Sequence, residues 1–403
     1  MAKTIRQAPE PSLPIAINVE VIMEKIIALS GRIDSTNAAQ VEADIQQQLS
    51  GFSGDVVLDA ADLAYISSAG LRVILRLKKA NPSTKLVNCS SEVYEILDMT
   101  GFTEMMSIAK AYRKLSIEGC EVIGEGANGI VYRTDPDTIV KVYKNPDSLE
   151  EIHNERELAR KAFVMGIPTA IPYDVVQVGD LYGSVFELLN AKSFAKLIRA
   201  GEPVEELARQ SVEILKTIHG THLKPGELPD KKKESMKWVS FTKEQLPAEI
   251  GEKLERLFNE IPETDTMLHG DYHIKNIMRQ NGENLLIDMD TLSMGHPVYE
   301  FAAIYAAYVG FCCSDPNNAA KFFDITLDQC RDMWRYTLKY YFDGKSEEYV
   351  SDVVKKAEII CYTRLLRWYS TKRSKEDADA QRAIAFCKDY LTKTIPTVDS
   401  LSF

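Results

Sequence analysis

The chain has 403 residues, more than one hydrophobic core usually serves, so two or three domains are expected. Its apolar content of 45% and charged content of 27% are ordinary for globular proteins and exclude a disordered or fibrous chain. A polar tail, residues 1–14, lacks the apolar core of a signal peptide, and no apolar run approaches the roughly 20 residues of a membrane-spanning helix. The most apolar late stretch, residues 301–313, is expected to be a buried helix.

Charge and cysteine content restrict the partners and the compartment. The net charge is −11, from 48 Lys and Arg against 59 Asp and Glu. Nucleic acid is an unfavourable partner, because phosphate binding needs clustered Lys and Arg. The acid surplus suits a cationic substrate, although an acidic surface is also a common solubility device. The seven cysteines form no CxxC pair and indicate free, mostly buried thiols in a reducing cytoplasm.

The first part of the chain, residues 15–114, alternates β-like and helical segments. Strands are expected at residues 15–21, 25–30, 55–59 and 85–88. Helices are expected at residues 37–49, 68–79 and 91–99. The first helix would be capped by Asp34, Ser35 and Thr36, and the last would end at Gly101. This alternation predicts a small α/β domain with helices covering a sheet.

The second part, residues 119–395, begins with β-like segments and continues with helical ones after a break at residues 115–119. Strands are expected at residues 122–134, at 138–143 and in two segments of 173–188. A helix, a polar loop and a hairpin are expected at residues 149–165, 224–235 and 276–290. A β-rich lobe, residues 119–190, followed by a helical lobe, residues 191–395, predicts an α+β bilobal kinase-like fold.

Three glycines, Gly124, Gly126 and Gly129, have GxGxxG spacing and are followed by Val131. Without side chains in the way, backbone N–H groups of such a loop approach nucleotide phosphates closely. The same spacing occurs in dinucleotide-binding folds and in ordinary turns, but those folds place a helix after the third glycine. The β-like continuation here favours the phosphate-binding hairpin of kinases.

Lys141 lies inside an apolar strand, where an ammonium group requires an anionic partner. ATP phosphates and a carboxylate on the following helix would supply it; a lysine on an exposed edge strand is the alternative. Glu157 is the expected ion partner on that helix, with Glu155 as its rival in the same region.

The strongest signal is the segment LHGDYHIKN at residues 268–276, followed by LLIDMD at residues 285–290. Phosphoryl transfer needs a carboxylate at the attacking hydroxyl and oxygen ligands for the Mg²⁺ that bridges the phosphates. Asp271 fits the first role, and Asn276 and Asp288 fit the second. The alternative, a capped turn with surface acids, does not account for four polar residue types at this spacing.

The HGDxxxxN segment and the IDxD strand resemble the aminoglycoside phosphotransferase and choline kinase-like superfamily, over roughly residues 119–391. The resemblance implies that Asp271 is the catalytic base, that Asn276 and Asp288 hold Mg²⁺, and that Lys141 holds ATP phosphates. A bilobal kinase fold is implied as well.

Three further roles follow from the same resemblance. Glu157 would pair with the phosphate-binding lysine. Glu187 would lie at the hinge beside the adenine, with a plain strand-end acid as the alternative. Relatives usually carry Asp where this chain has Glu300, which would brace the catalytic loop.

The segment at residues 62–75 reads as a strand, a turn and a helix, in which Ser67 or Ser68 caps a helix beginning near Ala69. A helix N-terminus stabilises negative charge, so a phosphate on that serine would be well tolerated. The segment resembles the STAS fold of anti-sigma-factor antagonists, in which a serine at this turn is phosphorylated and switches partner binding. The corresponding residue is Ser68. Ser67 replaces the Asp of many regulated members, so an unmodified cap is the alternative.

These patterns predict a cytoplasmic, bacterial-type kinase that uses ATP and Mg²⁺ to phosphorylate a hydroxyl of a small, cationic molecule. Its STAS-like domain, residues 15–114, would regulate the enzyme or recruit protein partners; neither nucleic acid nor membrane is an expected partner. The alternatives are a protein serine kinase of a sigma-factor-type partner-switching pathway and a catalytically silent signalling scaffold. The complete set of motif residues argues against the silent scaffold.

Overall fold

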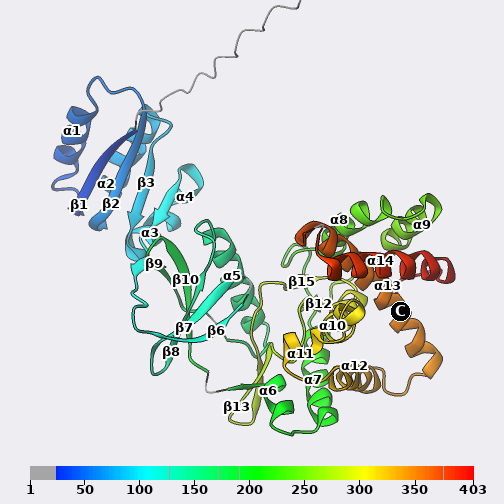
Figure 1. Cartoon of the computed structure of the whole chain (residues 1–403). Coiled ribbons are helices and arrows are strands. Elements are labelled where there is room, and N and C mark those ends of the chain that lie inside the picture. The colour runs from blue at the N-terminus through cyan, green and yellow to red at the C-terminus, as the bar shows by residue number, and fades with distance from the viewer. Residues whose placement is uncertain (1–23, 127, 171, 190, 375) are drawn as a thin grey trace, which may run out of the picture. The chain divides into compact units, whose positions relative to one another are not determined.

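A computed structural model describes the chain except for residues 1–23, 127, 171, 190 and 375. The chain forms two compact units, Met1–Arg113 and Lys114–Phe403 (Figure 1). The strand predicted at residues 15–21 lies outside the described residues.

The first unit contains a four-stranded sheet with the order β1-β2-β3-β4, in which all neighbouring strands are parallel (Figure 1). Its elements are β1 (Glu24–Ile33), α1 (Ala38–Leu49), β2 (Asp55–Ile66), α2 (Ser68–Ala80), β3 (Lys85–Cys89), α3 (Ser91–Met99), α4 (Phe102–Met105) and β4 (Ile108–Lys110). The parallel strands need helical crossovers, which explains the strand–helix alternation of the sequence. The predicted α/β class of this unit is confirmed.

Two features of the sequence fix the start of helix α2: a capping serine, and a glycine that allows the helix to pack closely on the strands. The Ser67 hydroxyl accepts a hydrogen bond from the Ala69 backbone N–H at 3.2 Å. A Cβ on Gly70 would lie 2.7 Å from a carbon of Ile66 and 2.8 Å from one of Ile33, so only glycine fits at this crossing. Ser67 is therefore the N-cap, and the helix starts at the next residue.

Two boundaries in this unit differ from the prediction. Strand β2 continues to Ile66 instead of ending at Asp59, because after an irregularity between Asp59 and Asp62 it stays paired with β1 up to Ile33. Asn37, not the preceding three residues, stands directly before α1, and its side chain accepts a hydrogen bond from the Asp34 backbone N–H at 2.9 Å.

The second unit begins with a six-stranded sheet of order β5-β9-β10-β8-β7-β6 (Figure 1). Its elements are β5 (Arg113–Lys114), β6 (Glu121–Glu125), β7 (Gly129–Asp135), β8 (Thr138–Tyr143), α5 (Leu149–Val164), β9 (Asp174–Val178) and β10 (Leu181–Glu187). The single strand predicted at residues 122–134 is wrong: the glycine-rich segment reverses the chain between β6 and β7, which pair antiparallel.

The two faces of this sheet have different environments. Because side chains alternate along a strand, β8 places Val140 and Val142 on one face and Lys141 and Tyr143 on the other. The first face is covered by a small buried cluster made of Val140, Val142, Val176, Val178 and Val185. Helix α5 packs on the second face through Glu155, which reaches both side chains there.

The rest of the second unit is mainly helical. It contains β11 (Lys192–Ser193), α6 (Phe194–Arg199), α7 (Val204–His219), α8 (Lys231–Lys243), α9 (Ala248–Asn259), β12 (Met267–Leu268), β13 (Ile277–Gln280), β14 (Glu283–Leu286), β15 (Ser293–Met294), α10 (Val298–Tyr308), η1 (Gly310–Cys313), α11 (Asn318–Phe323), α12 (Leu327–Tyr341), α13 (Glu347–Lys372), α14 (Ala378–Thr394) and η2 (Ile395–Thr397). The polar loop predicted at residues 224–235 is shorter than expected. Helix α8 starts at Lys231 because the Asp230 carboxylate accepts hydrogen bonds from the N–H groups of Lys232 and Lys233.

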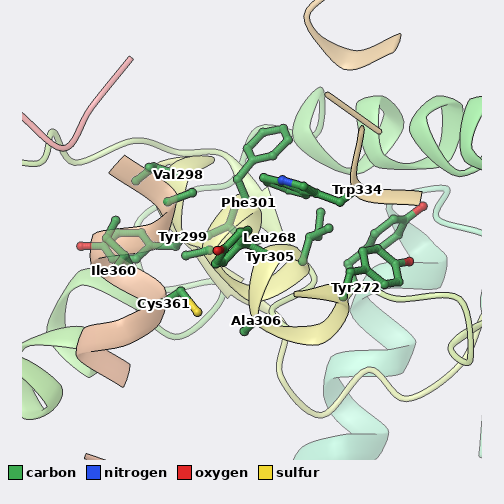
Figure 2. Close-up of a cluster of buried hydrophobic side chains, with 14 of the residues drawn as sticks. Leu268, Tyr272, Val298, Tyr299, Phe301, Tyr305, Ala306, Trp334, Ile360 and Cys361 are labelled. Atoms are coloured by element: carbon green, nitrogen blue, oxygen red, sulfur yellow. The ribbon is translucent and has the colours of Figure 1, made fainter. Parts of the chain in front are cut away.

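Helix α10 contributes Val298, Tyr299, Phe301 and Tyr305 to the buried hydrophobic cluster of the helical lobe (Figure 2). Nearly all of its side chains are buried, as predicted for the apolar stretch that starts at Phe301. The Phe301 ring lies 6.3 Å from that of Trp334 and 4.8 Å from that of Tyr341, both in edge-on geometry. Across the described part of the chain, every helix is too short or too polar to cross a membrane.

Candidate active site

The first part of the site is an ion pair between β8 and α5. The Lys141 ammonium donates to both carboxylate oxygens of Glu155, at 2.9 and 3.1 Å. The Tyr143 hydroxyl donates to the same carboxylate. Burial disfavours the charged form of Lys141, but the carboxylates of Glu155 and Asp288 outweigh it and raise the pKa of the ammonium. Lys141 therefore stays charged at neutral pH.

The predicted pairing of Lys141 with Glu157 is wrong. Residues two apart lie on different sides of a helix, and Glu155 shares the buried side of α5 with Ile152 and Leu158. Glu157 is half exposed and lies 3.9 Å from Lys161 one turn along. The apolar stripe of the helix, visible in the sequence, includes position 155 and could have decided between the two acids.

Replacing Glu155 by Ala is expected to weaken nucleotide binding and turnover far more than replacing Glu157 by Ala. The first change leaves a half-buried lysine and a buried tyrosine hydroxyl without their acceptor; the second removes only a surface pair of about 0.3–0.5 kcal/mol. Steady-state kinetics of the two variants, with ATP varied, checks this. Equal defects would contradict the assignment.

The second part of the site is the loop that follows β12. Gly270 has φ of +84°, and a Cβ there would lie 2.5 Å from the Thr291 carbonyl oxygen. Only glycine is compatible with this backbone, which explains the glycine in the HGD segment. The Thr291 hydroxyl donates to the His269 carbonyl at 2.7 Å and ties the loop to the segment after β14.

The Asp271 side chain is half exposed and faces two polar neighbours. Its Oδ2 atom lies 3.5 Å from Nε2 of His273. The Asn276 amide donates to the Asp271 backbone carbonyl at 3.0 Å and lies 3.4 Å from its carboxylate. Burial would raise the pKa of Asp271, but the contact with His273 holds it at about 2. The carboxylate is thus ionised and held close to the Asn276 amide.

Two further acids follow β14. Asp288 has φ of +67°, a left-handed conformation that Asp and Asn adopt more readily than most residues. Its Oδ1 atom is buried, 3.7 Å from the Lys141 ammonium, and no described residue hydrogen-bonds to it. Burial and the carboxylates of Asp288 and Glu155 raise the pKa of Asp290 to about 7. The negative charges of these carboxylates are therefore concentrated next to Lys141.

Glu300, at the start of α10, braces the catalytic loop. It is fully buried and accepts hydrogen bonds from the backbone N–H groups of His269, at 2.5 Å, and Gly270, at 3.0 Å. Burial opposes its charge, but His219 at 3.8 Å and these N–H donors hold the pKa of Glu300 below its ordinary value. The bracing that the resemblance implied is present, made by Glu where relatives carry Asp.

Replacing Glu300 by Gln is expected to lower the free energy of unfolding by about 2–4 kcal/mol, because one of two buried N–H donors then faces an amide NH₂ group. Glu300→Asp, which keeps the charge and is one methylene shorter, should lose less. Urea denaturation of both variants beside the parent protein makes the comparison. A Gln variant as stable as the parent would contradict the bracing role.

Gly124, Gly126 and Gly129 differ in how much space surrounds the position of a side chain. A Cβ on Gly124 would find its nearest atom at 3.8 Å, and one on Gly126 at 4.0 Å, so both border open space. A Cβ on Gly129 would lie 2.7 Å from the Val142 carbonyl oxygen. Packing against β8 therefore requires Gly129, whereas the other two glycines leave room for a ligand.

Glu187 ends β10, as predicted. It is paired with Thr138 on β8, so its side chain lies on the sheet face opposite Lys141. It borders a hollow of about 480 Å³ whose lining residues are Phe163, Thr169, Ala170, Tyr173, Glu187, Leu189, Gln280 and Leu285. No motif residue lines this hollow. A contact of Glu187 with adenine could therefore involve its backbone only.

The first unit has its own candidate site at the start of α2. Ser68 is exposed, and Arg72 lies one turn along the helix. The Arg72 guanidinium donates to the Ser68 carbonyl at 3.1 Å and lies 3.5 Å from its hydroxyl. A negative group on Ser68 would thus meet both a helix N-terminus and an arginine.

Comparisons with known proteins address both units. The family model "Phosphotransferase enzyme family" matches residues 119–319, and the model "STAS domain" matches residues 15–115. A protein of Bordetella bronchiseptica described as an anti-sigma factor antagonist, BtrV, is 36% identical over 90 residues, which are 21% of this chain and 78% of that protein.

Solved structures with similar backbones include two aminoglycoside phosphotransferases. The ADP-bound APH(2'')-Ib is 17% identical, with a TM-score of 0.47, covering 75% of this chain and 99% of that one. A thermostable mutant of APH(4)-Ia is 14% identical, with a TM-score of 0.48, covering 69% and 94%. The family matches, together with the catalytic-loop geometry, confirm the resemblances inferred from the sequence: the second unit belongs to the phosphotransferase enzyme family, and the first unit is a STAS domain.

Proposed function

We propose that the second unit transfers the γ-phosphoryl group of ATP to a hydroxyl group of a small molecule. The observation that carries this proposal is that Lys141 lies close to the charges of three motif carboxylates, those of Asp271, Asp288 and Asp290. Lys141 lies 3.7 Å from Asp288, and the charges of both act on Asp290 together with that of Asp271. Phosphoryl transfer requires this combination of a phosphate-holding cation, metal-binding oxygens and a carboxylate for the hydroxyl.

Asp271 is proposed as the catalytic base. Its depressed pKa keeps it ionised at neutral pH, and half of its side chain is open to an incoming acceptor. It would hold the acceptor hydroxyl in line with the γ-phosphorus and take its proton as the new P–O bond forms. Glu300 and Gly270 fix the backbone that presents this carboxylate.

Asn276 and Asp288 are proposed to hold Mg²⁺. The buried Oδ1 of Asp288, which has no hydrogen-bond partner among the described residues, fits a cation ligand, and the carboxylate crowding around Asp290 favours added positive charge. No group of three or more His, Cys, Asp or Glu side chains in the described ranges could hold a metal ion. Mg²⁺ usually takes one or two protein ligands plus phosphates and water, and it would neutralise charge on the phosphates.

The nucleotide is proposed to lie against the Lys141 face of the sheet. Val131, Ile139 and Phe186 share this face by strand pairing and are only partly buried. Such apolar side chains suit an adenine ring, while Gly124 and Gly126 leave space for phosphates beside Lys141. Glu187 would take part at the hinge through its backbone.

We place the reaction in the cytoplasm, where ATP is available and the seven free cysteines stay reduced.

The STAS domain is proposed to bind a protein partner, as the similarity to an anti-sigma factor antagonist suggests. Ser68 is the proposed switch, because a phosphate there would gain the helix N-terminus and Arg72.

Ser68→Glu is expected to leave the free energy of unfolding within about 0.5 kcal/mol of the parent value, because the exposed helix start accepts negative charge. If the domain regulates the enzyme in cis, phosphoryl-transfer turnover of this full-length variant will differ from that of Ser68→Ala. Identical turnover at every ATP concentration would exclude regulation in cis and leave an outside partner as the target.

A panel of acceptors tests the proposed activity. Full-length protein with ATP and Mg²⁺ is assayed for ADP release against alcohols of two to six carbons, sugars, aminoglycosides and a generic serine-containing protein substrate. Release that depends on a small alcohol supports the proposal. Release that depends only on the protein substrate would replace it with a protein kinase.

A further inference from the structure

The hollow beside the end of β10 is a second candidate site. Its volume of about 480 Å³ lies within the range of pockets that hold small organic molecules. Glu187 lines it from the end of β10, Phe163 from the end of α5, and Gln280 and Leu285 from the hairpin of β13 and β14. Among the described residues, none of the glycine-rich loop or the catalytic loop borders it, so the hollow is separate from the proposed active site.

Backbone hydrogen bonds hold the walls of this hollow together. The Leu286 N–H donates to the Pro168 carbonyl at 2.7 Å, and the Ala170 N–H donates to the Leu286 carbonyl at 3.2 Å. The Tyr173 N–H donates to the Val185 carbonyl of β10 at 3.0 Å. These bonds join the hairpin to the segment before β9, and that segment to β10. The hollow is therefore preformed, as ligand pockets usually are.

The Glu187 side chain lies beside an aromatic ring. Glu187 pairs directly with Thr138 of β8, so the two side chains stand next to each other on one face of the sheet. The Tyr173 hydroxyl donates to the Thr138 hydroxyl at 3.2 Å, which brings its ring close to Glu187. Tyr173 and Phe163 are 53% and 55% exposed, and both line the hollow. Exposed rings next to a carboxylate favour an organic cation.

The polar groups of the hollow complement the same kind of ligand. The Glu187 carboxylate has no hydrogen bond or ion pair within the described residues, and no lysine or arginine of these residues lines the hollow. Arg156 donates to the backbone carbonyl of Tyr173 at 3.4 Å but does not border the hollow. The amide oxygen of Gln280 is buried and lacks a hydrogen-bond partner in the described part of the chain. An ammonium group would supply both the positive charge and the N–H donors that these two acceptors need.

We propose that this hollow binds a small organic cation, a primary ammonium on an aromatic or apolar body, as an effector of the enzyme. The ammonium donates to the Glu187 carboxylate and the Gln280 amide oxygen, and the body packs on Phe163 and Tyr173. The hollow joins the β-rich lobe to a hairpin of the helical lobe, so its occupation changes nucleotide binding between the lobes. This effector role rests on the proposed kinase function, whereas the binding site does not.

The test uses three probes that share a phenyl ring and lack a hydroxyl group, so that none of them can serve as a phosphoryl acceptor. They are phenethylamine, hydrocinnamide and hydrocinnamate, which carry an ammonium, a neutral amide and a carboxylate. Calorimetric titration of the full-length protein measures the Kd of each probe.

Four variants locate the binding site. Glu187→Gln and Phe163→Ala alter exposed residues of the hollow. Glu157→Gln is the matched control, because it removes a half-exposed acid of α5 that does not line the hollow. Asp271→Asn reports whether the cation binds instead at the proposed acceptor position.

We expect phenethylamine to bind about tenfold or more tightly than the amide or the carboxylate, because only the ammonium complements Glu187. Glu187→Gln should weaken amine binding by about tenfold or more, and Phe163→Ala by about threefold or more. Glu157→Gln and Asp271→Asn should retain the parental affinity for the amine. Saturating amine should change the Kd of a non-hydrolysable ATP analogue with Mg²⁺ by about threefold or more, and the analogue should change the Kd of the amine by the same factor.

The binding site is overturned by absent amine binding, by tighter binding of the carboxylate, or by equal amine affinity in the parent and Glu187→Gln proteins. Loss of amine binding in Asp271→Asn alone would place the cation at the acceptor position and overturn the site as well. An unchanged Kd of the ATP analogue would overturn the effector role. Failure to bind the analogue at all would refute the proposed kinase function and with it the effector role, while the amine titrations would still decide the site.

Discussion

Replacement of Asp271 by Asn is expected to lower phosphoryl-transfer turnover by about 10²-fold or more, with nucleotide affinity near that of the parent protein. The amide keeps the size of the side chain and its place beside Asn276, but it cannot take the proton of the acceptor hydroxyl. The Lys141–Glu155 pair, which we propose to hold the phosphates, lies on other elements and is left intact. Steady-state kinetics with a true acceptor, and a melting experiment with Mg-ATP, make the two measurements.

A surface acid from the same region supplies the control. Asp265 is exposed and pairs with His222 at 2.9 Å, away from the motif residues. Asp265→Asn should therefore retain parental turnover. Full turnover in Asp271→Asn would show that another group accepts the proton, and a large loss in the control variant would show that the effect is not specific to the base.

The phosphotransferase family of the second unit could be predicted from the sequence because its motif residues lie in two short segments. The loop from His269 to Asn276 is rigidly determined by local features, namely a glycine at positive φ and backbone N–H groups that require an acceptor. The same local rule predicted Ser67 or Ser68 as the cap of α2, and Ser67 is the cap. Where the residues of a functional site lie in one short segment of the sequence, their types and spacing are sufficient to recognise the site.

The choice between Glu155 and Glu157 was less determined, because it depends on which side of α5 is buried. A shift of two residues moves a side chain to another side of the helix. The sequence contained the answer in the apolar positions of that helix, but both the reading of the residues and the resemblance favoured Glu157. Glu187 ends β10 as predicted, but strand alternation puts its side chain on the sheet face opposite Lys141.

The region around the acceptor could not be predicted, since it depends on contacts between distant segments. Trp238 of α8 contacts Arg364 of α13, and Phe322 of α11 packs against His273, through helix packing that no motif predicts.

Replacement of Asp288 is expected to abolish the Mg²⁺-dependent part of the stabilisation by ATP, because its buried oxygen is the proposed metal ligand. Two variants separate this role from the backbone. At φ of +67°, Ala is strained by about 1 kcal/mol, whereas Asn tolerates the conformation, so only Asp288→Ala should melt earlier without ligand. Both variants should lose the Mg-ATP shift, which amounts to about 2.7 kcal/mol at a hundredfold excess over Kd in a protein that binds. A parental shift in Asp288→Asn alone would mean that an amide oxygen suffices, and a parental shift in both variants would mean that Mg²⁺ binds elsewhere. Repeating the titration with ATP and a chelator checks that the shift depends on the metal.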